Sequence, residues 1–367
     1  MRITALSVLI LVFGIQCTSN AQLQYELLSE IADEDLAFVN SPENKIENSK
    51  EEKGLIADMP REEGPVLISI DSNYSNLDSG DICAEAWKVG PFISPYWLKT
   101  PENPAQLNTG VSYSYLAGKL IQAKAVDASE CLFNGLLANG WANPCGLEKA
   151  RPQVVEWQNQ FDETIFRAAK ENRIPATLLK KLIVEETQFW PATNYEILEY
   201  GLGQATNIGL DPLFFYYPEF YKMTCDSVYS NDTCKKSYLT LSEGYRSLLR
   251  GYVIGNYINA DCPYCDYGVD VQKAEESIDI FAKLLVANCH QVNQIMVYLT
   301  VRSAGDNSSY EDLWRFTLVN YNAGAGCLTE AMTQTLIDGE LLTWDNVSKN
   351  LVEPCTNAKG YVENITR

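Results

Sequence analysis

The sequence predicts a mainly α-helical fold with an N-terminal extension and a cysteine-rich insertion. Apolar residues recur at intervals of three and four in several long stretches after Val154, a spacing typical of amphipathic helices. No strong alternation of apolar and polar residues, which half-buried strands show, separates these stretches. The chain has 367 residues and is 46% hydrophobic, which is enough for one sizeable core or two smaller ones.

Residues 1–21 are predicted to be a secretory signal peptide. Arg2 precedes an apolar run over residues 5–15, and Ser19 and Ala21 then form a small-x-small step. We therefore expect an exported protein that is periplasmic, extracellular or held in the cell envelope.

A lipid anchor on Cys17 is the alternative to simple cleavage. Gly14 and Gln16 disfavour it, because a branched apolar residue and a small residue are expected at those positions of a lipobox. No later segment reaches the roughly 18 to 20 apolar residues that a membrane-spanning helix needs.

Two segments separate the signal from the main domain. Residues 22–65 are acidic and include one Tyr and one Phe, too little apolar surface to offset the entropy of ordering, so we predict a disordered tether. Residues 66–150 are richer in aromatic and turn residues and contain three cysteines, but no motif identifies their role. They are predicted to form either a small subdomain or a belt on the domain that follows.

The cysteines predict disulfides. Eleven are present, and the ten outside the signal segment suit five disulfides in an oxidising compartment. Connectivity is open, and the simplest local pairings are Cys131–Cys145 and Cys225–Cys234. Cys262 and Cys265 could instead supply half of a zinc site, but export and the presence of a single histidine, His290, favour a disulfide.

The charge of the chain excludes some classes of partner. Its formal net charge is -20 and its pI is near 4.5. Binding to nucleic acid requires clustered Lys and Arg to neutralise phosphates, so no nucleic-acid partner is expected. An anionic membrane surface is disfavoured for the same reason.

Residues 151–367 are predicted to form the main domain. Pro175 suits the first turn of a new helix after the stop near Ile174. The expected helical stretches are 154–173, 175–190, 243–258, 274–302 and 310–324.

The helix expected at 175–190 contains two adjacent glutamates with different surroundings. At about 100° per residue, one arc collects Leu178, Leu179, Leu182, Ile183, Phe189 and Trp190. Glu186 falls near the middle of this arc, whereas Glu185 lies at its edge beside lysines. Apolar surroundings disfavour the charged form of a carboxyl group and raise its pKa toward the range of a general acid. The alternative is that Glu186 only belongs to a polar network inside a helical core.

Three short blocks resemble the motifs of a known family. The chain has ETQF at 186–189, GLGQ at 201–204 and NYNAG at 320–324. Their order and spacing are similar to the Glu-Ser-x-Phe, Gly-Leu-Met-Gln and Ala-Tyr-Asn-Ala-Gly blocks of the soluble lytic transglycosylases. The resemblance covers roughly residues 155–345 and includes a helical stretch at 277–285 before the last block. It implies a lysozyme-like catalytic domain.

The resemblance also implies a reaction. Such an enzyme cleaves the β-1,4 bond between N-acetylmuramic acid and N-acetylglucosamine in peptidoglycan glycan strands and leaves a 1,6-anhydro ring. Glu186 would protonate the bridging oxygen and then accept the proton of the C6 hydroxyl of the sugar. The N-acetyl group of the substrate would stabilise the cationic centre, so neither a cofactor nor a metal is expected.

The resemblance assigns further residues to substrate binding: Thr187, Phe189, Gly201, Leu202, Gln204, Tyr321 and Asn322. Tyr321 would donate to Glu186 or orient it, and Asn322 would hold a substrate amide. Gly203, where the family has Met, is expected to open space beside the cleft, and the insertion between residues 210 and 272 to reshape the sugar-binding groove. Thr187 replaces a serine and keeps the hydroxyl.

Other functions remain as alternatives. Glu196 and Glu199 precede GLGQ, and either could serve as the second carboxylate of a hydrolase similar to goose lysozyme. A non-catalytic glycan-binding protein with the same fold is a rival of another class. A thiol enzyme is disfavoured, because a Cys or Ser nucleophile usually needs a nearby base and His290 lies in a stretch typical of an ordinary helix. A metalloprotein is disfavoured, since the sequence has no HExxH motif or acidic cation loop. GLGQ also fails as a dinucleotide motif, because Thr206 occupies the place of the third glycine.

Overall fold

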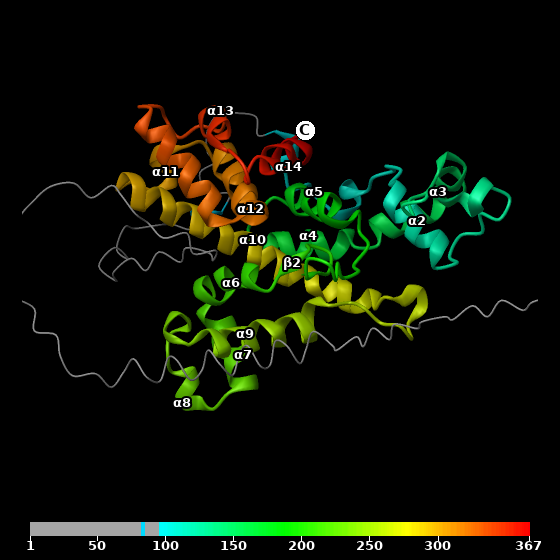
Figure 1. Ribbon diagram of the computed structural model, residues 1–367, viewed down its shortest axis with the longest axis horizontal. Coiled ribbons are helices and arrows are strands. Elements are labelled where there is room, and N and C mark those ends of the chain that lie inside the picture. The colour runs from blue at the N-terminus through cyan, green and yellow to red at the C-terminus, as the bar shows by residue number, and fades with distance from the viewer. Residues whose placement is uncertain (1–81, 85–94) are drawn as a thin grey trace, which may run out of the picture. The chain divides into compact units, whose positions relative to one another are not determined.

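The described part of the chain is mainly helical, as the sequence predicts (Figure 1). The computed structural model describes residues 82–84 and 95–367. The predicted signal peptide with Cys17, the predicted tether and most of the segment up to residue 94 lie outside the described residues. Strands β1 (Glu199–Tyr200) and β2 (Ala205–Thr206) form one antiparallel pair of two residues each.

Within the described residues, three α-helices precede the one that carries Glu186: α2 (Ser114–Gln122), α3 (Pro144–Asn159) and α4 (Asp162–Glu171). Helix α3 begins where it does because Pro144 suits a first helical position and the Asn143 side chain accepts from the backbone N–H of Gly146 at 2.9 Å. The expected domain boundary at residue 150 therefore falls inside a helix. The single stretch expected at 154–173 is divided into α3 and α4.

Helix α5 (Ala176–Thr187) is shorter than the sequence predicts. Pro175 stands just before it as the N-cap residue. Gln188 and Phe189 have left-handed backbone conformations, with φ of 47° and 66°, and they end the helix. Phe189 and Trp190 therefore do not continue the helical arc, and the rotation of 100° per residue does not apply to them.

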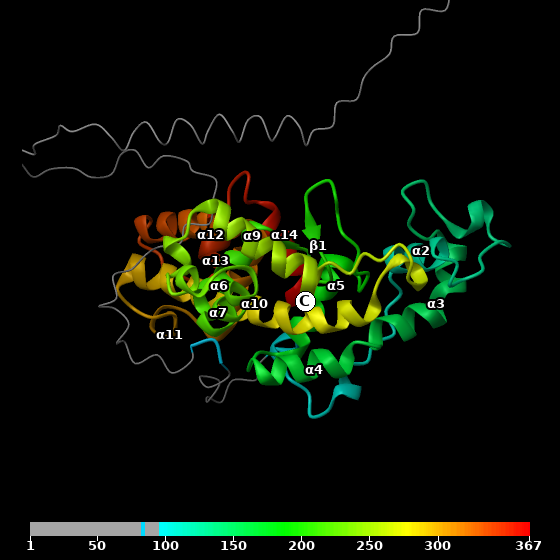
Figure 2. The ribbon, with the colours of Figure 1, turned by 90° about the horizontal axis from the view of Figure 1, so that it is seen from below.

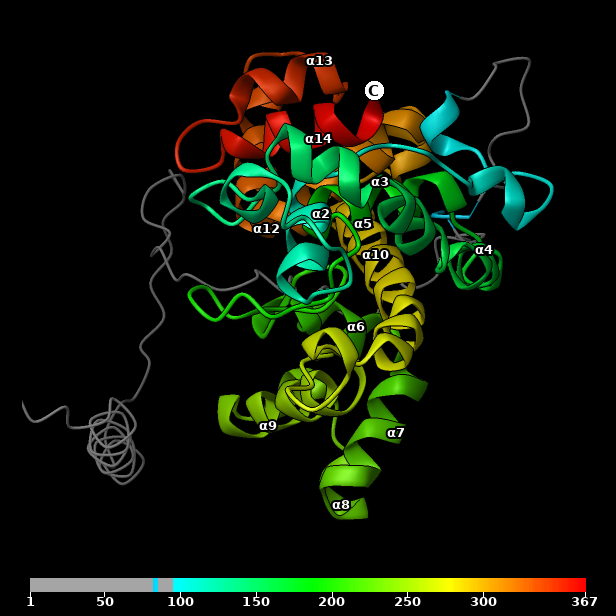
Figure 3. The ribbon, with the colours of Figure 1, turned by 90° about the vertical axis from the view of Figure 1, so that its right-hand side faces the viewer.

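The cysteine-rich insertion forms a group of helices on one side of the long helix α10 (Val271–Thr300), as Figures 1 and 3 show. Its elements are α6 (Asp211–Tyr216), α7 (Pro218–Val228), α8 (Asn231–Cys234), α9 (Glu243–Val253) and a π-helical turn, Ile254–Ile258. A buried ion pair joins α6 to α9: Arg250 donates to Asp211 at 2.9 Å, and the Tyr238 hydroxyl donates to the same carboxylate. Removal of Arg250 would leave the buried Asp211 carboxylate without a cationic partner.

The C-terminal helices complete the core: α11 (Ala304–Asn307), α12 (Tyr310–Ile337), α13 (Trp344–Val347) and α14 (Asn357–Thr366). Helices α10 and α12 pack along each other, α14 packs against α12, and α14 also contacts α5. Helix α12 is interrupted at Gly324, where φ is 84° and ψ is 166°, a conformation open to glycine. One hydrophobic core joins side chains of the extension, such as Trp97 and Leu116, to those of α5 and α12.

Five disulfides confirm the prediction from the cysteine count: Cys83–Cys289, Cys131–Cys145, Cys225–Cys234, Cys262–Cys265 and Cys327–Cys355. The two simplest local pairings are both present. Cys262 and Cys265 pair with each other, so they are not free as zinc ligands. The Cys83–Cys289 bond spans 206 residues and ties the extension to α10.

Candidate active site

A pocket of about 390 Å³ lies between α5, the segment leading to β1, and α2. Figure 2 shows α5 between the β1 hairpin and α2. The lining residues are Tyr115, Glu186, Thr187, Trp190, Ala192, Thr193, Asn194, Tyr195, Glu196, Glu199 and Gln204. The pocket thus contains three carboxylates and three aromatic side chains.

Glu186 is half-buried in this pocket and accepts a hydrogen bond from the C-terminal helix, α14. The hydroxyl of Tyr361, on α14, donates to its Oε1 atom. The pKa of Glu186 is raised to about 8, chiefly by burial; the negative charges of Glu199 and Glu185 also raise it, and the hydrogen bond from Tyr361 lowers it. No other described residue donates to the carboxylate. Glu186 therefore carries a proton at neutral pH and has one oxygen free for a ligand, the state required of a general acid.

The neighbouring Glu185 has a different partner. The side-chain amide of Asn364, one turn after Tyr361 on α14, donates to it at 2.8 Å. The expected lysines do not pair with it: Lys180 is buried and bonds to Asp162 at 2.5 Å, and Lys181 donates to a backbone carbonyl of α14 at 2.9 Å. The expectation of a lysine-flanked Glu185 was therefore wrong, because Lys180 faces the core.

Tyr321 does not play the part that the resemblance implied. Its hydroxyl donates to the backbone carbonyl of Gly203 at 2.6 Å, and Tyr361 donates to Glu186 instead. Burial and the charges of Glu186 and Glu199 keep the pKa of Tyr321 well above its usual range, so it stays a neutral donor. Tyr361 had no signal in the sequence, since 175 residues separate it from Glu186.

The GLGQ turn is tightly packed. A Cβ atom on Gly201, whose φ is 69°, would lie 2.8 Å from the carbonyl oxygen of Ile258. A Cβ atom on Gly203 would lie 2.6 Å from the ring of Phe281 and 2.9 Å from the hydroxyl of Tyr321. The expectation that Gly203 opens space beside the cleft was wrong, because Phe281 and Tyr321 fill that space. The glycines let the turn pack closely.

Gln204 has the position expected of a polar pocket residue. Its side-chain amide nitrogen donates to the carbonyl oxygens of Gly201 at 2.8 Å and of Ala192 at 3.2 Å. Both donors are thus used within the protein. Its carbonyl oxygen receives no hydrogen bond from the residues that the structure describes, and it can accept one from a ligand.

The other residues assigned to substrate binding have different positions. The Thr187 hydroxyl lines the pocket but donates to the backbone carbonyls of Ile183 at 3.1 Å and Leu202 at 3.0 Å, so it joins α5 to the GLGQ turn. Phe189 and Leu202 are completely buried and do not line the pocket. Asn322 is exposed and lies outside the pocket lining. For these three residues the structure corrects the assignment.

Both candidate second carboxylates line the pocket. Glu196 is exposed on the loop before β1, and Glu199 is half-buried in β1. Burial raises the pKa of Glu199. Glu199 is near enough that its charge raises the pKa of Glu186. The pocket therefore contains two half-buried carboxyl groups, Glu186 and Glu199, and an exposed one, Glu196.

The outer wall of the pocket is fastened to the insertion. Asp261 accepts from the backbone N–H of Thr193 at 3.2 Å and from the hydroxyl of Tyr195. The Thr193 hydroxyl donates to the side chain of Asn259 at 3.2 Å. Because Asp261 directly precedes the Cys262–Cys265 disulfide, a closed loop of the insertion holds this wall.

None of the three aromatic residues of the pocket, Tyr115, Trp190 and Tyr195, was predicted as a site residue. Trp190 stacks on Trp157 with ring centroids 5.2 Å apart. Tyr115 belongs to α2, whose first turn is fixed to the end of α5 because the backbone N–H of Tyr115 donates to Gln188 at 3.0 Å. The extension thus contributes to the site, which its sequence did not indicate.

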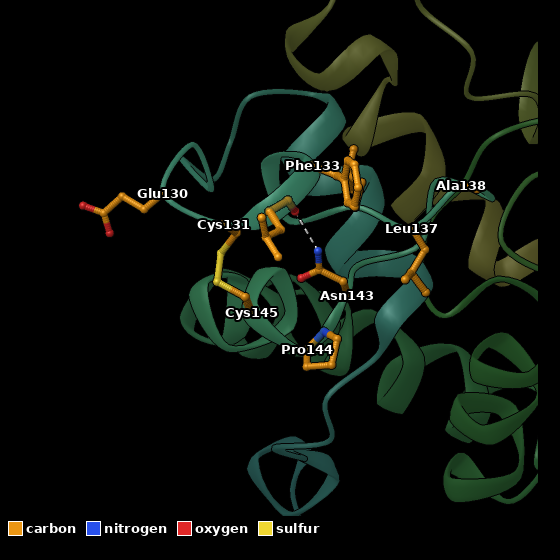
Figure 4. Close-up of a pocket in the computed structure, with 10 residues that line it drawn as sticks. Glu130, Cys131, Phe133, Leu137, Ala138, Asn143, Pro144 and Cys145 are labelled. Carbon is orange, nitrogen blue, oxygen red and sulfur yellow. Dashed lines mark hydrogen bonds between the residues drawn. A yellow bond between two sulfur atoms is a disulfide. The ribbon is translucent and has the colours of Figure 1, made fainter.

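A larger hollow of about 840 Å³ lies in the connection between α2 and α3 (Figure 4). It is lined mostly by apolar side chains and by the Cys131–Cys145 disulfide. The Asn143 amide nitrogen is engaged by the carbonyl of Leu132 at 2.9 Å, and Glu130 points away toward Lys149, 2.6 Å from it. The hollow offers no pair of groups for acid–base chemistry.

No family model, curated protein or solved structure matches this chain. Within residues 82–84 and 95–367, no group of three or more His, Cys, Asp and Glu side chains is arranged to hold a metal ion. In the same described ranges, no helix is long and apolar enough to cross a membrane.

Proposed function

We propose that this protein is a lytic transglycosylase that acts on peptidoglycan glycan strands, with Glu186 as its single acid and base. The observation that carries the proposal is the half-buried carboxyl group of Glu186, which lies in a pocket, accepts from Tyr361 and has its pKa raised to about 8. The same pocket contains Gln204 from the second block of the resemblance. Binding alone does not require an acid with a raised pKa, which favours catalysis over a purely glycan-binding role.

In the proposed mechanism, Glu186 first donates its proton to the oxygen that bridges two sugars. The bond from C1 to that oxygen breaks, and the N-acetyl group of the substrate stabilises the cationic carbon. The Glu186 carboxylate then takes the proton of the C6 hydroxyl, whose oxygen closes the anhydro ring on C1. Tyr361 stabilises the carboxylate between the two steps through its hydrogen bond.

The proposal includes a lysozyme-like arrangement of the domain and an exported location. The catalytic acid at the end of a buried helix, with a short β hairpin beside it, supports the first part. Five disulfides support the second, because disulfides persist in oxidising compartments. A periplasmic or cell-envelope location would give the enzyme access to peptidoglycan.

A hydrolase of the lysozyme type is the second candidate. It is favoured by Glu199, a half-buried carboxyl group that lines the same pocket and lies close to Glu186. In that mechanism Glu199 would activate a water molecule, which would add to C1 in place of the C6 hydroxyl. The two candidates differ in their products.

The deciding experiment is digestion of purified peptidoglycan followed by mass analysis of the released fragments. The proposed enzyme yields fragments with 1,6-anhydro ends, each one water lighter than the reducing ends that a hydrolase gives. Glu199→Gln separates the two candidates again, since it should abolish hydrolysis but leave transglycosylation measurable. Binding to sacculi without release of fragments by the wild-type chain would reject both and favour the glycan-binding alternative.

A further inference from the structure

Trp141 is an exposed aromatic residue beside the pocket of Glu186. The residue is 41% exposed, and its ring packs against the ring of Tyr115, with centroids 6.0 Å apart and planes inclined by 63°. Tyr115 lines the pocket. The ring of Trp141 therefore extends the aromatic wall of the pocket outward over α2.

The backbone of the chain fixes Trp141 in this place. A Cβ atom on Gly118, within α2, would lie 2.3 Å from the carbonyl oxygen of Gly140 and 2.9 Å from the Cα of Trp141. The loop can thus contact the helix directly only because residue 118 is a glycine. On the other side of Trp141, the backbone N–H of Ala142 donates to the carbonyl of Ser114 at 2.9 Å. This bond is a second link between the loop and α2.

The loop itself is also held by side chains. Asn139 accepts from the backbone N–H of Trp141 at 3.1 Å, and the Gln122 amide donates to the carbonyl of Gly140 at 2.8 Å. The φ of Gly140 is 81°, a conformation in which other residues are strained. The exposed ring is therefore presented by a closed, hydrogen-bonded loop.

An exposed, fixed tryptophan next to a polar pocket suits a sugar ring. Tryptophan offers a large, rigid contact surface and loses little conformational entropy when a ligand binds. A pyranose ring has a face of C–H bonds that packs on an aromatic ring, while its hydroxyl groups remain at the rim in water. Because Trp141 adjoins the pocket through Tyr115, the ligand that fits it is the next part of the same glycan strand.

We propose that Trp141 forms an outer subsite that binds a sugar ring of the glycan strand beyond the sugars held at Glu186. This inference rests on the proposed function, since it assumes that the pocket takes a β-1,4-linked glycan. It makes Trp141 a binding residue and assigns a role to the extension, whose Tyr115 and Trp141 together lengthen the groove. Strands that are long enough to reach Trp141 bind more tightly than short ones.

The test measures binding and does not depend on cleavage. Every protein carries Glu186→Gln, so that bound strands stay intact, and the ligands are the disaccharide and the hexasaccharide of β-1,4-linked N-acetylglucosamine, titrated by calorimetry. Trp141→Ala should weaken hexasaccharide binding about tenfold, a common loss when a contact tryptophan is truncated. The disaccharide affinity should stay within about twofold. Trp141→Phe, which keeps an aromatic face, should recover most of the loss.

Tyr264→Ala is the matched control, because Tyr264 is a fully exposed aromatic residue on the insertion loop and lines no part of the pocket. The affinity of this control for the hexasaccharide should equal that of the parent, the chain that carries Glu186→Gln alone. Melting temperatures should show that all variants fold. Equal weakening of both ligands by Trp141→Ala, no weakening of either, or no binding of glycan by the parent overturns the subsite. Product analysis on peptidoglycan is separate and uses the wild-type chain: selective weakening by Trp141→Ala, together with no release of fragments by the wild type, supports the subsite and rejects the proposed function.

Discussion

Glu186 and Glu185 are adjacent in the chain, yet the structure gives them different chemistry. Glu186→Gln should lower turnover on peptidoglycan by about 10²- to 10⁴-fold or more, because the amide cannot transfer the proton. Glu185→Gln should be mild, since Glu185 accepts from Asn364 and lies outside the pocket lining. Initial rates of fragment release measure both effects. Near-normal turnover by Glu186→Gln, or loss of turnover only in Glu185→Gln, would place the active site elsewhere.

The raised pKa of Glu186 also predicts how stability depends on pH. In the unfolded chain the carboxyl group ionises near pH 4.5, whereas in the folded chain its pKa is about 8. The stability linked to this group is therefore fully present below pH 4.5 and is lost as the pH rises toward 8. Glu186→Gln has no such proton. The melting temperature of the variant should therefore rise relative to that of the wild type as the pH increases across this window. A constant difference would show that the pKa of Glu186 is ordinary.

The two tyrosines near Glu186 should affect the pH–rate profile differently. With a protonated acid, kcat/KM should fall as the pH rises through about 8. The hydrogen bond from Tyr361 lowers the pKa of Glu186, so Tyr361→Phe should move this fall to higher pH. Tyr321→Phe is the control: Tyr321 donates to the carbonyl of Gly203, and its removal should leave the pH of the fall unchanged. An unmoved profile in Tyr361→Phe would mean that the hydrogen bond does not tune the acid.

The sequence predicted the partly buried setting of Glu186 but not the residues around it, for physical reasons. Helical rotation placed Glu186 correctly because it lies within α5. Phe189 follows the left-handed end of that helix, so the same rotation could not place it. Tyr361 comes from a helix 175 residues away, and only the packing of α14 on α5 brings the two together.

At the level of elements, the long helices were predicted and their interruptions were not. The stretch expected at 274–302 corresponds to α10, Val271–Thr300, because its apolar spacing continues without a break. The stretch at 154–173 is divided into α3 and α4, although its spacing of apolar residues continues across the break. The sequence also did not predict that the insertion supports the pocket wall, because this support comes from contacts of Asp261 with a loop nearly seventy residues earlier.

The contact between the insertion loop and the pocket wall leads to a prediction. Asp261→Ala removes the acceptor for Thr193 and Tyr195, which both line the pocket. The wall should become mobile, and KM for glycan strands should rise severalfold while kcat changes less, because Glu186 is untouched. Asp266→Ala, an exposed residue of the same loop, is the matched control. Equal effects of the two substitutions on KM would exclude a specific role for Asp261.

At the scale of the whole molecule, the disulfides differ in how much chain they constrain. Cys83–Cys289 closes a segment of 206 residues, whereas Cys262–Cys265 closes one of 3 residues. In the chain-entropy account a longer closed loop restricts the unfolded state more, and removal of a long-range bond typically costs about 2–5 kcal/mol. This long-range bond is also a covalent link between the extension and α10.

Replacement of Cys83 and Cys289 together by Ala should therefore lower the free energy of unfolding by about 3 kcal/mol or more, and replacement of Cys262 and Cys265 by much less. Urea denaturation of both double variants and the parent measures the difference, and thiol titration of the unfolded, unreduced parent should find no free thiols. The pocket wall should instead be disturbed more by loss of Cys262–Cys265 than by loss of Cys83–Cys289, because Cys262 directly follows Asp261, which bonds to the wall. A greater loss of stability from the short loop than from the long one would contradict the chain-entropy argument for this protein.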